Sequence, residues 1–333
     1  MTMTHEHHKM FRPRQTRLVA TMSEGHHPIV AIGVPCYNRP DLLDKALTSL
    51  RAQTYPAISI LISDNASPNP DVGKVASRHA AEDSRVRYVR QTTNIGASRN
   101  FEYVLTNTDS PYFMWASDDD WWEPDFVARC VDRLEEEGEG VVSVVTEALH
   151  ETPQASFTFF DQGEAFRQFR SRSALERMRN FALNRFGNLV YAVHRRDALF
   201  HQGRTIWAWT GRVANEYPPL LIVASKGDIL TLPGVGFHKG TPKHLCELLR
   251  WHVQGGWFPR RKFYYTVTRA HKHVWAHIAS YWDMKRAISS LDLDNDSKNE
   301  ILSIVRKTLF VDARDMVIGW RRPIAGAQST RSA

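Results

Sequence analysis

Three adjacent carboxylates, Asp118, Asp119 and Asp120, carry the strongest chemical signal in this chain, and they stand between an apolar run and Trp121-Trp122-Glu123-Pro124. Like charges this close raise one another's pKa and resist burial unless a cation or water neutralises them. Carboxylate oxygens suit hard cations such as Mg²⁺ or Mn²⁺, and Mg²⁺ usually fills its other positions with water and substrate phosphate. The triplet therefore indicates a site for a divalent cation and a nucleotide diphosphate, with a solvated acidic turn as the alternative.

The elements that must position this triplet are alternating strands and helices. Apolar runs predict buried strands over residues 29–34, 58–62, 86–89 and 111–116. Helical spacing of apolar residues follows the first and third of them. This alternation predicts a mostly parallel sheet with right-handed crossovers. Three loops should then meet at the carboxyl ends of the strands, where ligands bind in such sheets, namely 35–39, 63–68 and 116–123.

Four short motifs occur in order along these elements: Val34-Pro35-Cys36-Tyr37-Asn38-Arg39, Ser63-Asp64-Asn65-Ala66-Ser67, Asn94-Ile95-Gly96 with Arg99-Asn100, and the acidic triplet. Together they resemble the family 2 glycosyltransferases of the GT-A fold, closely from residue 28 to about 145 and loosely to about 240. The resemblance implies an α/β fold of the GT-A type, a mostly parallel twisted sheet flanked by helices. It also implies transfer of a sugar from a UDP-, GDP- or dTDP-linked donor, assisted by Mn²⁺ or Mg²⁺.

The resemblance also implies roles for single residues. The first two loops hold the nucleotide base and ribose, and the Arg after the Gly helps to hold the nucleotide, roles that fall on Pro35, Tyr37, Asn38, Asp64 and Arg99. The acidic motif holds ribose and metal. Many relatives have Asp where Ser117 stands here, so metal contact is expected first from Asp120 and second from Asp118.

These roles also make physical sense for the side chains concerned. Tyr37 could stack on a planar base, and the Asp64 carboxylate could accept a hydrogen bond from a base N–H. Arg99 offers a fixed fork of donors to phosphate or to a base carbonyl. The alternatives are that Tyr37 packs on the rim, that Asp64 caps the next turn and that Arg99 makes a surface ion pair.

The later half of the chain supplies candidates for the acceptor side. An inverting transfer needs a base for the acceptor hydroxyl, and Glu216 is the candidate, because an acidic residue from a loop or helix start of the later half serves in relatives of this fold. The alternative is a carboxylate that stabilises a helix N-terminus. His238 is a candidate contact for metal or phosphate, with a rim histidine as the alternative. Candidate walls of an acceptor pocket are Trp121, Trp122, Trp207 and Trp209, which otherwise belong to the core.

Length and composition divide the chain of 333 residues into a catalytic domain and an extension. We expect a disordered tail over 1–27, a nucleotide-sugar-binding half over 28–145, an acceptor half over 146–240, a helical region over 241–320 and a second disordered tail over 321–333. No apolar run is long enough to span a membrane. The three cysteines lack disulfide or zinc spacing, which favours a reducing compartment, and hence the cytoplasm.

The C-terminal region is rich in tryptophan and basic residues, as in Trp251, Trp275, Trp282 and Lys285. Such helices could lie on an anionic membrane surface, which would suit a lipid-linked saccharide acceptor, or they could pack on the catalytic domain or a second copy. The net charge of +7 also admits a nucleic-acid-binding protein, but the expected modules are absent and the acidic triplet would repel a polyanion. A GT-A-like scaffold without catalysis is the remaining alternative.

Overall fold

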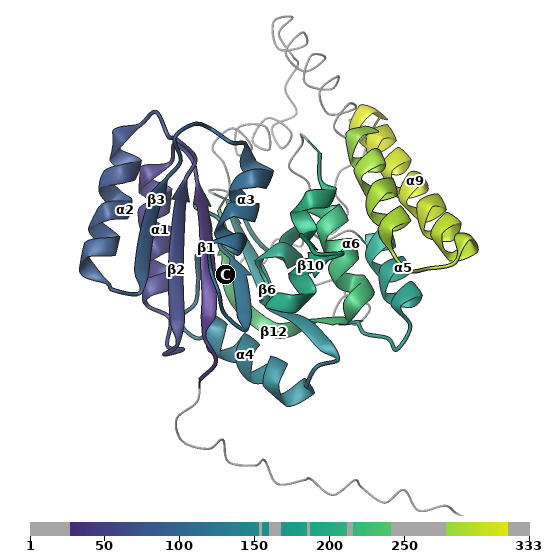
Figure 1. The fold of residues 1–333 in the computed structure, drawn as a ribbon, viewed down its shortest axis with the longest axis horizontal. Helices are drawn as coiled ribbons and strands as arrows, with labels where there is room; N and C mark the ends of the chain where they lie inside the picture. The colour runs from purple at the N-terminus through teal and green to yellow at the C-terminus, as the bar shows by residue number, and fades with distance from the viewer. Residues whose placement is uncertain are drawn as a thin grey trace, which may run out of the picture.

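The computed structural model describes residues 27–152, 155–159, 168–184, 187–211, 216–240 and 278–318. In this part of the chain a curled sheet is flanked by helices (Figure 1). The strands are β1 (Val30–Cys36), β2 (Ile58–Asp64), β3 (Val86–Arg90), β4 (Tyr112–Trp115), β5 (Trp121–Trp122), β6 (Val141–Thr152), β7 (Ala155–Phe159), β8 (Gln168–Phe169), β9 (Val193–Arg195), β10 (Phe200–His201), β11 (Arg204–Thr205) and β12 (Asp228–Lys239).

The helices connect these strands and cover the sheet. They are α1 (Pro40–Arg51), α2 (Pro70–Glu82), α3 (Ala97–Thr106), α4 (Phe126–Glu137), α5 (Ala174–Asn184), α6 (Tyr217–Lys226) and α9 (Asn295–Ile318), with short 3₁₀ helices η2 (Gly187–Tyr191), η3 (Arg196–Leu199) and η4 (Ile206–Trp209). Residues 278–290 form a further helical stretch.

The main sheet has the strand order β3-β2-β1-β4-β9-β6-β12-β5. Its first four strands are parallel to one another, as the alternation of strands and helices predicts. The second half is mixed, because β9 runs antiparallel to both β4 and β6, while β12 runs parallel to β6. The carboxyl ends of β1, β2 and β4 therefore lie at one edge and deliver the three predicted loops together.

Burial explains why the first strands and helices pack as they do. Every residue of β1 is buried, as expected for a strand covered on both faces. Gly33 lets α3 approach closely, since a Cβ there would lie 2.5 Å from Cγ2 of Val104 and 2.8 Å from Cζ of Phe113. The buried stripe of α1, predicted from helical spacing, consists of Leu43, Ala46, Leu47 and Leu50.

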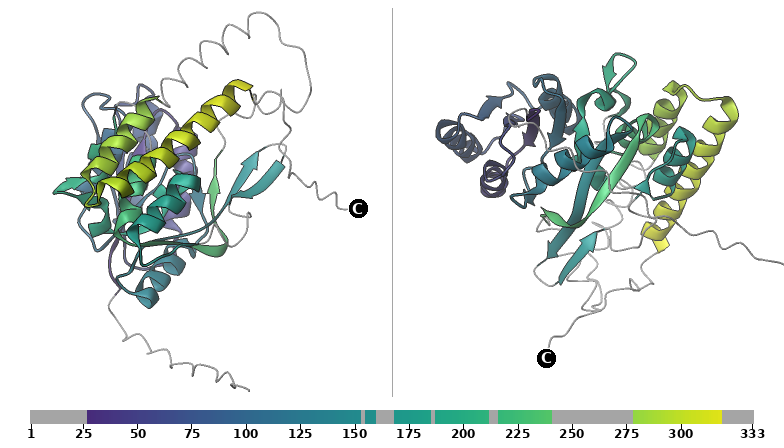
Figure 2. Two further views of the ribbon diagram at one scale, coloured as in Figure 1. Left: turned by 90° about the vertical axis from the view of Figure 1, so that its right-hand side faces the viewer. Right: turned by 90° about the horizontal axis from the view of Figure 1, so that it is seen from below.

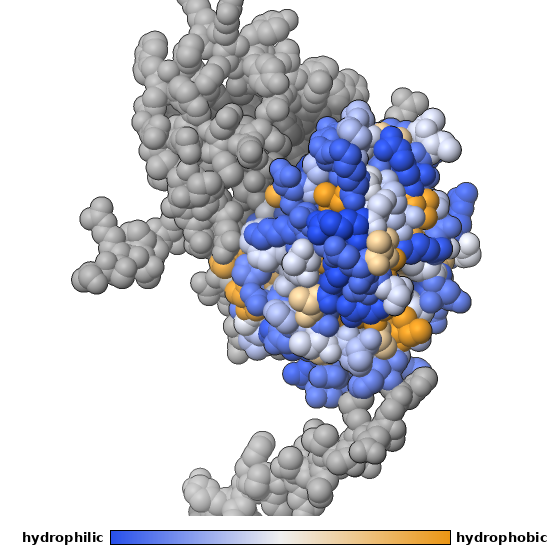
Figure 3. Space-filling model, turned by 90° about the vertical axis from the view of Figure 1, so that its left-hand side faces the viewer, coloured by the Kyte–Doolittle hydropathy of each residue, from blue (hydrophilic) through white to orange (hydrophobic). Residues whose placement is uncertain are grey.

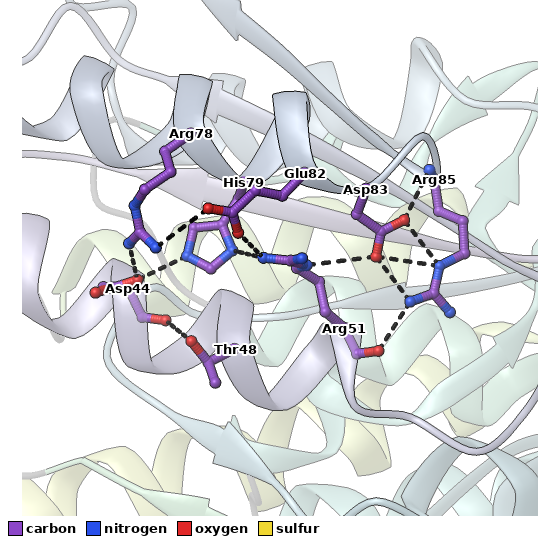
Figure 4. A network of polar contacts seen from close by, with 8 residues as sticks. All are labelled: Asp44, Thr48, Arg51, Arg78, His79, Glu82, Asp83 and Arg85. Atoms are coloured by element: carbon purple, nitrogen blue, oxygen red, sulfur yellow. Dashed lines mark hydrogen bonds and ion pairs between the residues drawn. The ribbon is translucent and has the colours of Figure 1, made fainter.

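A polar network joins α1 to α2 (Figure 4). The buried His79 lies 2.7 Å from Asp44 Oδ1 through Nε2 and 2.9 Å from Arg51 Nη1 through Nδ1. Because a guanidinium can only donate, Nδ1 accepts and Nε2 carries the proton that is donated to Asp44. This hydrogen bond lowers the pKa of Asp44. The network therefore ties α1 to α2 through charged side chains.

The face of the molecule on the α2 side is largely hydrophilic, with apolar residues scattered over it (Figure 3). At the opposite end, the stretch 278–290 and α9 run side by side (Figures 1 and 2) and bury Met284, Ile288, Ile301 and Val305. Both were predicted to be helical. No helix in the described ranges is long and apolar enough to cross a membrane.

The structure differs from the sequence pattern in one short segment, and another segment lies mostly outside the described residues. The apolar run 187–193 predicts a strand by its pattern alone, but the structure forms the 3₁₀ helix η2 before β9 begins at Val193. Apolar periodicity alone does not distinguish a short buried strand from a short buried helix. Most of the basic aromatic segment, with Trp251 and Trp275, lies outside the described residues. Trp282 is described and exposed, and Lys285 Nζ lies 5.1 Å from its ring centroid.

Candidate functional site

The first and second loops are tied to each other and to the acidic triplet. Tyr37 N donates to Asp118 Oδ2 at 3.0 Å, and Asn38 N donates to Ser67 Oγ at 2.9 Å. Asn38 has a φ of 61°, a left-handed conformation that Asn tolerates, and its Oδ1 accepts from Asn69 N at 3.2 Å. The tyrosine ring itself is exposed. The geometry therefore brings Tyr37, Asn38 and Asp118 together, as the motifs predicted.

Asp64 is fully buried and holds its own loop. Its carboxylate accepts hydrogen bonds from Ser67 N at 2.8 Å, from Tyr88 Oη at 3.1 Å and from Arg90 Nη1 at 3.2 Å. The turn-capping role considered as an alternative is thus present in the structure. Contact between Asp64 and a nucleotide base stays a prediction.

The third motif positions the start of α3. Ile95 N donates to Asn65 Oδ1 at 2.8 Å, and Gly96 precedes the helix with a φ of 86°, which few residues other than glycine adopt. Asn100 is buried against β2. Arg99 is exposed and forms no ion pair with any other described residue, so its guanidinium remains available for a ligand at this edge.

The acidic triplet is held by one arginine and one lysine. Asp118 is only 1% exposed, and its Oδ1 lies 2.5 Å from Nη2 of Arg39. Arg39 also pairs with Asp119, which accepts a hydrogen bond from the Ser117 hydroxyl. Burial raises the pKa of Asp118 to about 7. Ser117, where many relatives have Asp, thus supports the triplet through a hydrogen bond.

Asp120 is equally buried but has different partners. Its Oδ2 lies 2.9 Å from Nζ of Lys239, and its Oδ1 accepts from Gly240 N at 2.9 Å. Burial raises the pKa of Asp120 to about 6. The contact requires glycine at 240, because a Cβ there would lie 1.8 Å from the carbonyl oxygen of Asp119.

Two buried carboxylates offer the hard oxygen ligands that Mg²⁺ and Mn²⁺ prefer. Asp118 Oδ1 is buried and accepts no hydrogen bond, although it is paired with Arg39. The described residues contain no cluster of three or more His, Cys, Asp and Glu side chains suited to a metal. The residues therefore fit a cation that takes Asp118 and Asp120 from the protein and its other ligands from substrate and water.

The contacts described for His238 are with residues other than these two carboxylates, and its contact with a metal stays a prediction. Its Nε2 lies 2.6 Å from Glu123 Oε1, and its ring stacks on Trp121 with centroids 5.3 Å apart. Neighbouring side chains of a strand point to opposite faces. Since Lys239 points to Asp120, His238 points away from it.

Glu216 precedes α6, and its carboxylate lies beside Gly187, the first residue of η2. This glutamate is the N-cap residue of α6 without a side-chain capping hydrogen bond, so the alternative of a charge that stabilises this helix N-terminus remains. Burial is the main reason that the pKa of the Tyr191 phenol is raised to about 12, and the charges of Asp120 and Glu216 contribute to that increase. Lys239 Nζ lies 4.4 Å from the Tyr191 ring centroid.

The four tryptophans do not form one wall. Trp122 and Trp207 are 3% and 4% exposed, and Trp207 packs on Phe101 with centroids 5.0 Å apart. Neither ring offers a face to a sugar, which corrects the prediction for these two. Trp121 and Trp209 are partly exposed, but Trp121 is stacked by His238 and Lys45 Nζ lies 2.8 Å from its ring centroid.

Three further residues complete the site, and sequence reasoning connected none of them with the acidic triplet. Arg39 and Lys239 neutralise the carboxylates, and the ring of Tyr191 lies against the ammonium of Lys239. Arg39 stands in the first motif and was identifiable from it. Lys239 and Tyr191 are distant in sequence from the triplet, and no spacing connects them to it. Pro35 is the sixth of the seven residues of β1 and therefore lies at the carboxyl edge of the sheet.

Loops gathered at the carboxyl ends of parallel strands around two buried carboxylates define a GT-A-type transferase fold. Solved structures share this fold. S. aureus TarS 1-349 in complex with UDP-GlcNAc superposes with a TM-score of 0.60 at 11% identity, covering 89% of this chain and 76% of that chain. The mannosyltransferase PcManGT from Pyrobaculum calidifontis, in complex with GDP-Man and Mn²⁺, gives 0.50 at 16% identity and covers 88% and 85%. At these identities the likeness shows the fold alone.

Comparison of the sequence with known families gives a partial match. Residues 31–189 match the model of glycosyl transferase family 2. Glycosyltransferase GlyA of Streptococcus pneumoniae is 30% identical over 107 residues, which are 32% of this chain and 15% of GlyA. Succinoglycan biosynthesis protein ExoW of Rhizobium meliloti is 31% identical over 98 residues, 29% of this chain and 31% of ExoW. The matched region thus spans less than a third of either relative.

Proposed function

We propose that this protein transfers a sugar from a nucleotide-diphosphate donor to a hydroxyl group, with inversion at the anomeric carbon and with a divalent cation. The observation that carries the proposal is the pair of buried carboxylates, Asp118 and Asp120, held at the carboxyl edge of the sheet by the loops of the family motifs. Burying carboxylates costs stability, and a ligand-binding role gives a reason for keeping them there.

The donor side of the reaction is assigned to the first three loops. Tyr37 has an exposed ring for stacking on a base, and Arg99 has an unpaired guanidinium among the described residues for phosphate. Asp118 and Asp120 would hold the divalent cation. When bound, such a cation stabilises the charge that develops on the departing nucleoside diphosphate.

The acceptor side is assigned to Glu216. A carboxylate at that position would take the proton of the acceptor hydroxyl as its oxygen attacks the anomeric carbon. The absence of a capping hydrogen bond leaves the side chain available, and its carboxylate lies beside Gly187 at the start of η2, the helix that carries Tyr191. Attack opposite the departing diphosphate gives inversion.

The structural neighbours suggest which donors to test. TarS and PcManGT were solved with UDP-GlcNAc and GDP-Man respectively, so UDP- and GDP-sugars are the first donors to examine for this chain, followed by dTDP-sugars. A saccharide or a lipid-linked saccharide is proposed as the acceptor, in keeping with a relative named for succinoglycan biosynthesis.

The test is a thermal-shift panel of UDP, GDP, CDP and dTDP, each with and without Mn²⁺. A ligand at a hundred times its Kd should stabilise the fold by about 2.7 kcal/mol. We expect one nucleotide to raise the Tm and Mn²⁺ to enlarge the effect. If no nucleotide raises the Tm with or without Mn²⁺, the chain is a scaffold rather than a transferase. Donor hydrolysis or transfer with the stabilising nucleotide then identifies the sugar.

A further inference from the structure

The ammonium group of Lys239 is paired with Asp120, a carboxylate that the proposed cation would bind. Its Nζ lies 2.9 Å from Asp120 Oδ2, while Gly240 N donates to the other oxygen at 2.9 Å. The Asp120 side chain is fully buried and that of Lys239 is 23% exposed. Both oxygens of Asp120 therefore have a partner within the protein.

The backbone holds the lysine at this point. Lys239 ends β12 and pairs in register with β6, and Gly240 packs against the carbonyl of Asp119 so closely that no Cβ fits. The ammonium is further held above the Tyr191 ring. Arg39 differs, since its side chain is 42% exposed and bridges Asp118 and Asp119, so its guanidinium can turn to solvent when a cation takes its place.

An ammonium and a divalent cation on one carboxylate oxygen repel each other strongly, because little water screens them in a buried site. A cation that binds Asp120 must therefore move Lys239 or share the carboxylate with it at a cost. Moving it leaves a buried ammonium in need of a new anion. A nucleoside diphosphate brought with the cation supplies that anion.

We propose that Lys239 is a built-in competitor of the divalent cation at Asp120, which keeps the carboxylate neutralised until cation and diphosphate arrive together. The proposal rests on the proposed function. It makes cation binding weak without a nucleotide and strong with one. The protein thus avoids holding a divalent ion in an empty donor site.

The experiment measures Mn²⁺ binding to the full chain by electron paramagnetic resonance of free Mn²⁺. The variants are Lys239→Met, which removes the charge and the donor, and Lys239→Gln, which keeps a hydrogen-bond donor for Asp120. Lys74→Met is the matched control, because Lys74 pairs with Asp71 on the exposed surface of α2. Circular dichroism checks that each variant is folded, and Lys239→Gln carries the test if Lys239→Met does not fold.

Without nucleotide, we expect the Lys239 variants to bind Mn²⁺ about tenfold or more tightly than wild type, the usual size of a coupling between sites. The control should match wild type. Adding UDP or GDP should tighten Mn²⁺ binding more in wild type than in the variants. Equal or weaker Mn²⁺ binding in the folded Lys239 variants would overturn the proposal that Lys239 competes with the cation. The proposed glycosyl transfer would not be affected by that result. If neither wild type nor variants bind Mn²⁺ with any nucleoside diphosphate, the metal part of the proposed function falls as well.

Discussion

Asn100 and Ser63 exchange two hydrogen bonds in the buried layer between α3 and β2. Ser63 Oγ donates to Asn100 Oδ1 at 2.6 Å, and Asn100 Nδ2 donates to the Ser63 carbonyl at 2.9 Å. Gln91 Nε2 completes the set by donating to Ser63 Oγ at 3.0 Å. This pair locks the first turn of α3, which carries Arg99, to the end of the strand that carries Asp64.

Replacement of Asn100 by Ala should therefore affect both stability and ligand binding. The change leaves buried groups of Ser63 without partners, which costs about 1–3 kcal/mol of unfolding free energy. Urea denaturation measures this loss, with Thr106→Ala near the other end of the same helix as the control. Nucleotide binding should weaken too, because Arg99 loses its support. A folded Asn100→Ala protein with wild-type stability would show that the pair contributes nothing.

Arg99→Met should weaken binding of the nucleotide identified by thermal shift. A hydrogen bond from a charged donor contributes about 1.5–3 kcal/mol, so calorimetry should give a Kd about ten- to a hundredfold higher. Arg172→Met is the matched control, since Arg172 is also exposed and precedes α5, near the amino end of β12. Equal affinity in Arg99→Met and wild type would remove Arg99 from the donor pocket.

Asp118→Asn should abolish Mn²⁺-dependent nucleotide binding and also change how stability depends on pH. The pKa of Asp118 is about 7 in the folded protein, above its ordinary value of 3.8. A raised pKa contributes stability that is present at low pH and is lost as pH rises through 7. The Asn variant lacks this loss, so its stability relative to wild type should increase by roughly 2–3 kcal/mol from pH 5 to pH 8.

Urea denaturation at both pH values checks this expectation. Asp119→Asn is the control, because the side chain of Asp119 is 14% exposed whereas that of Asp118 is 1% exposed. A constant difference between Asp118→Asn and wild type across this range would mean that Asp118 is ionised throughout. Retention of full Mn²⁺-dependent turnover would remove it from the metal site.

Glu216→Gln should slow transfer about a hundredfold or more, the usual scale for loss of a positioned general base. Donor binding should change little, because the amide keeps the shape of the side chain and the nucleotide loops lie elsewhere. The measurement is kcat with the identified donor and acceptor across pH 6 to 9, with donor Kd as the control. Wild-type kcat throughout would place the base elsewhere. Asp197 is a poor alternative for the general base, since it lines the same cavity as Pro111, which precedes the amino end of β4.

His194 should make the fold sensitive to acid. It is fully buried, with Nδ1 2.7 Å from Ser143 Oγ and Nε2 3.2 Å from the Val190 carbonyl. Burial lowers the pKa of His194 from 6.5 to about 4. A lowered pKa contributes stability that is present above pH 6.5 and is lost as pH falls toward 4. That loss is roughly 3 kcal/mol.

His194→Gln is the test, because Gln can keep both a donor and an acceptor but does not titrate. The unfolding free energy of wild type should fall relative to the variant between pH 6.5 and 4. Asp118 contributes the opposite slope in this range, so the difference between wild type and His194→Gln isolates the histidine. Parallel pH profiles for the two proteins would contradict the expectation.

The sequence by itself determined the parallel half of the fold. Its apolar runs are continuous and its loops carry unambiguous turn formers, so β1, β2, α1 and the acidic loop were predictable. The motifs predicted that Tyr37, Asn38 and Asp118 meet, because parallel strands bring their carboxyl ends to one edge. Local pattern and topology sufficed here.

Tertiary structure alone decided the rest. Lys239 and Tyr191 reach the triplet from the mixed half of the sheet, where pairing between distant strands, rather than any local spacing, sets which side chains meet. Burial sorted the tryptophans, since an indole suits a core and a sugar pocket equally well. His238 faces away from Asp120 because a strand alternates its side chains, and only the register of β12 fixed which of its two last residues faces the carboxylate.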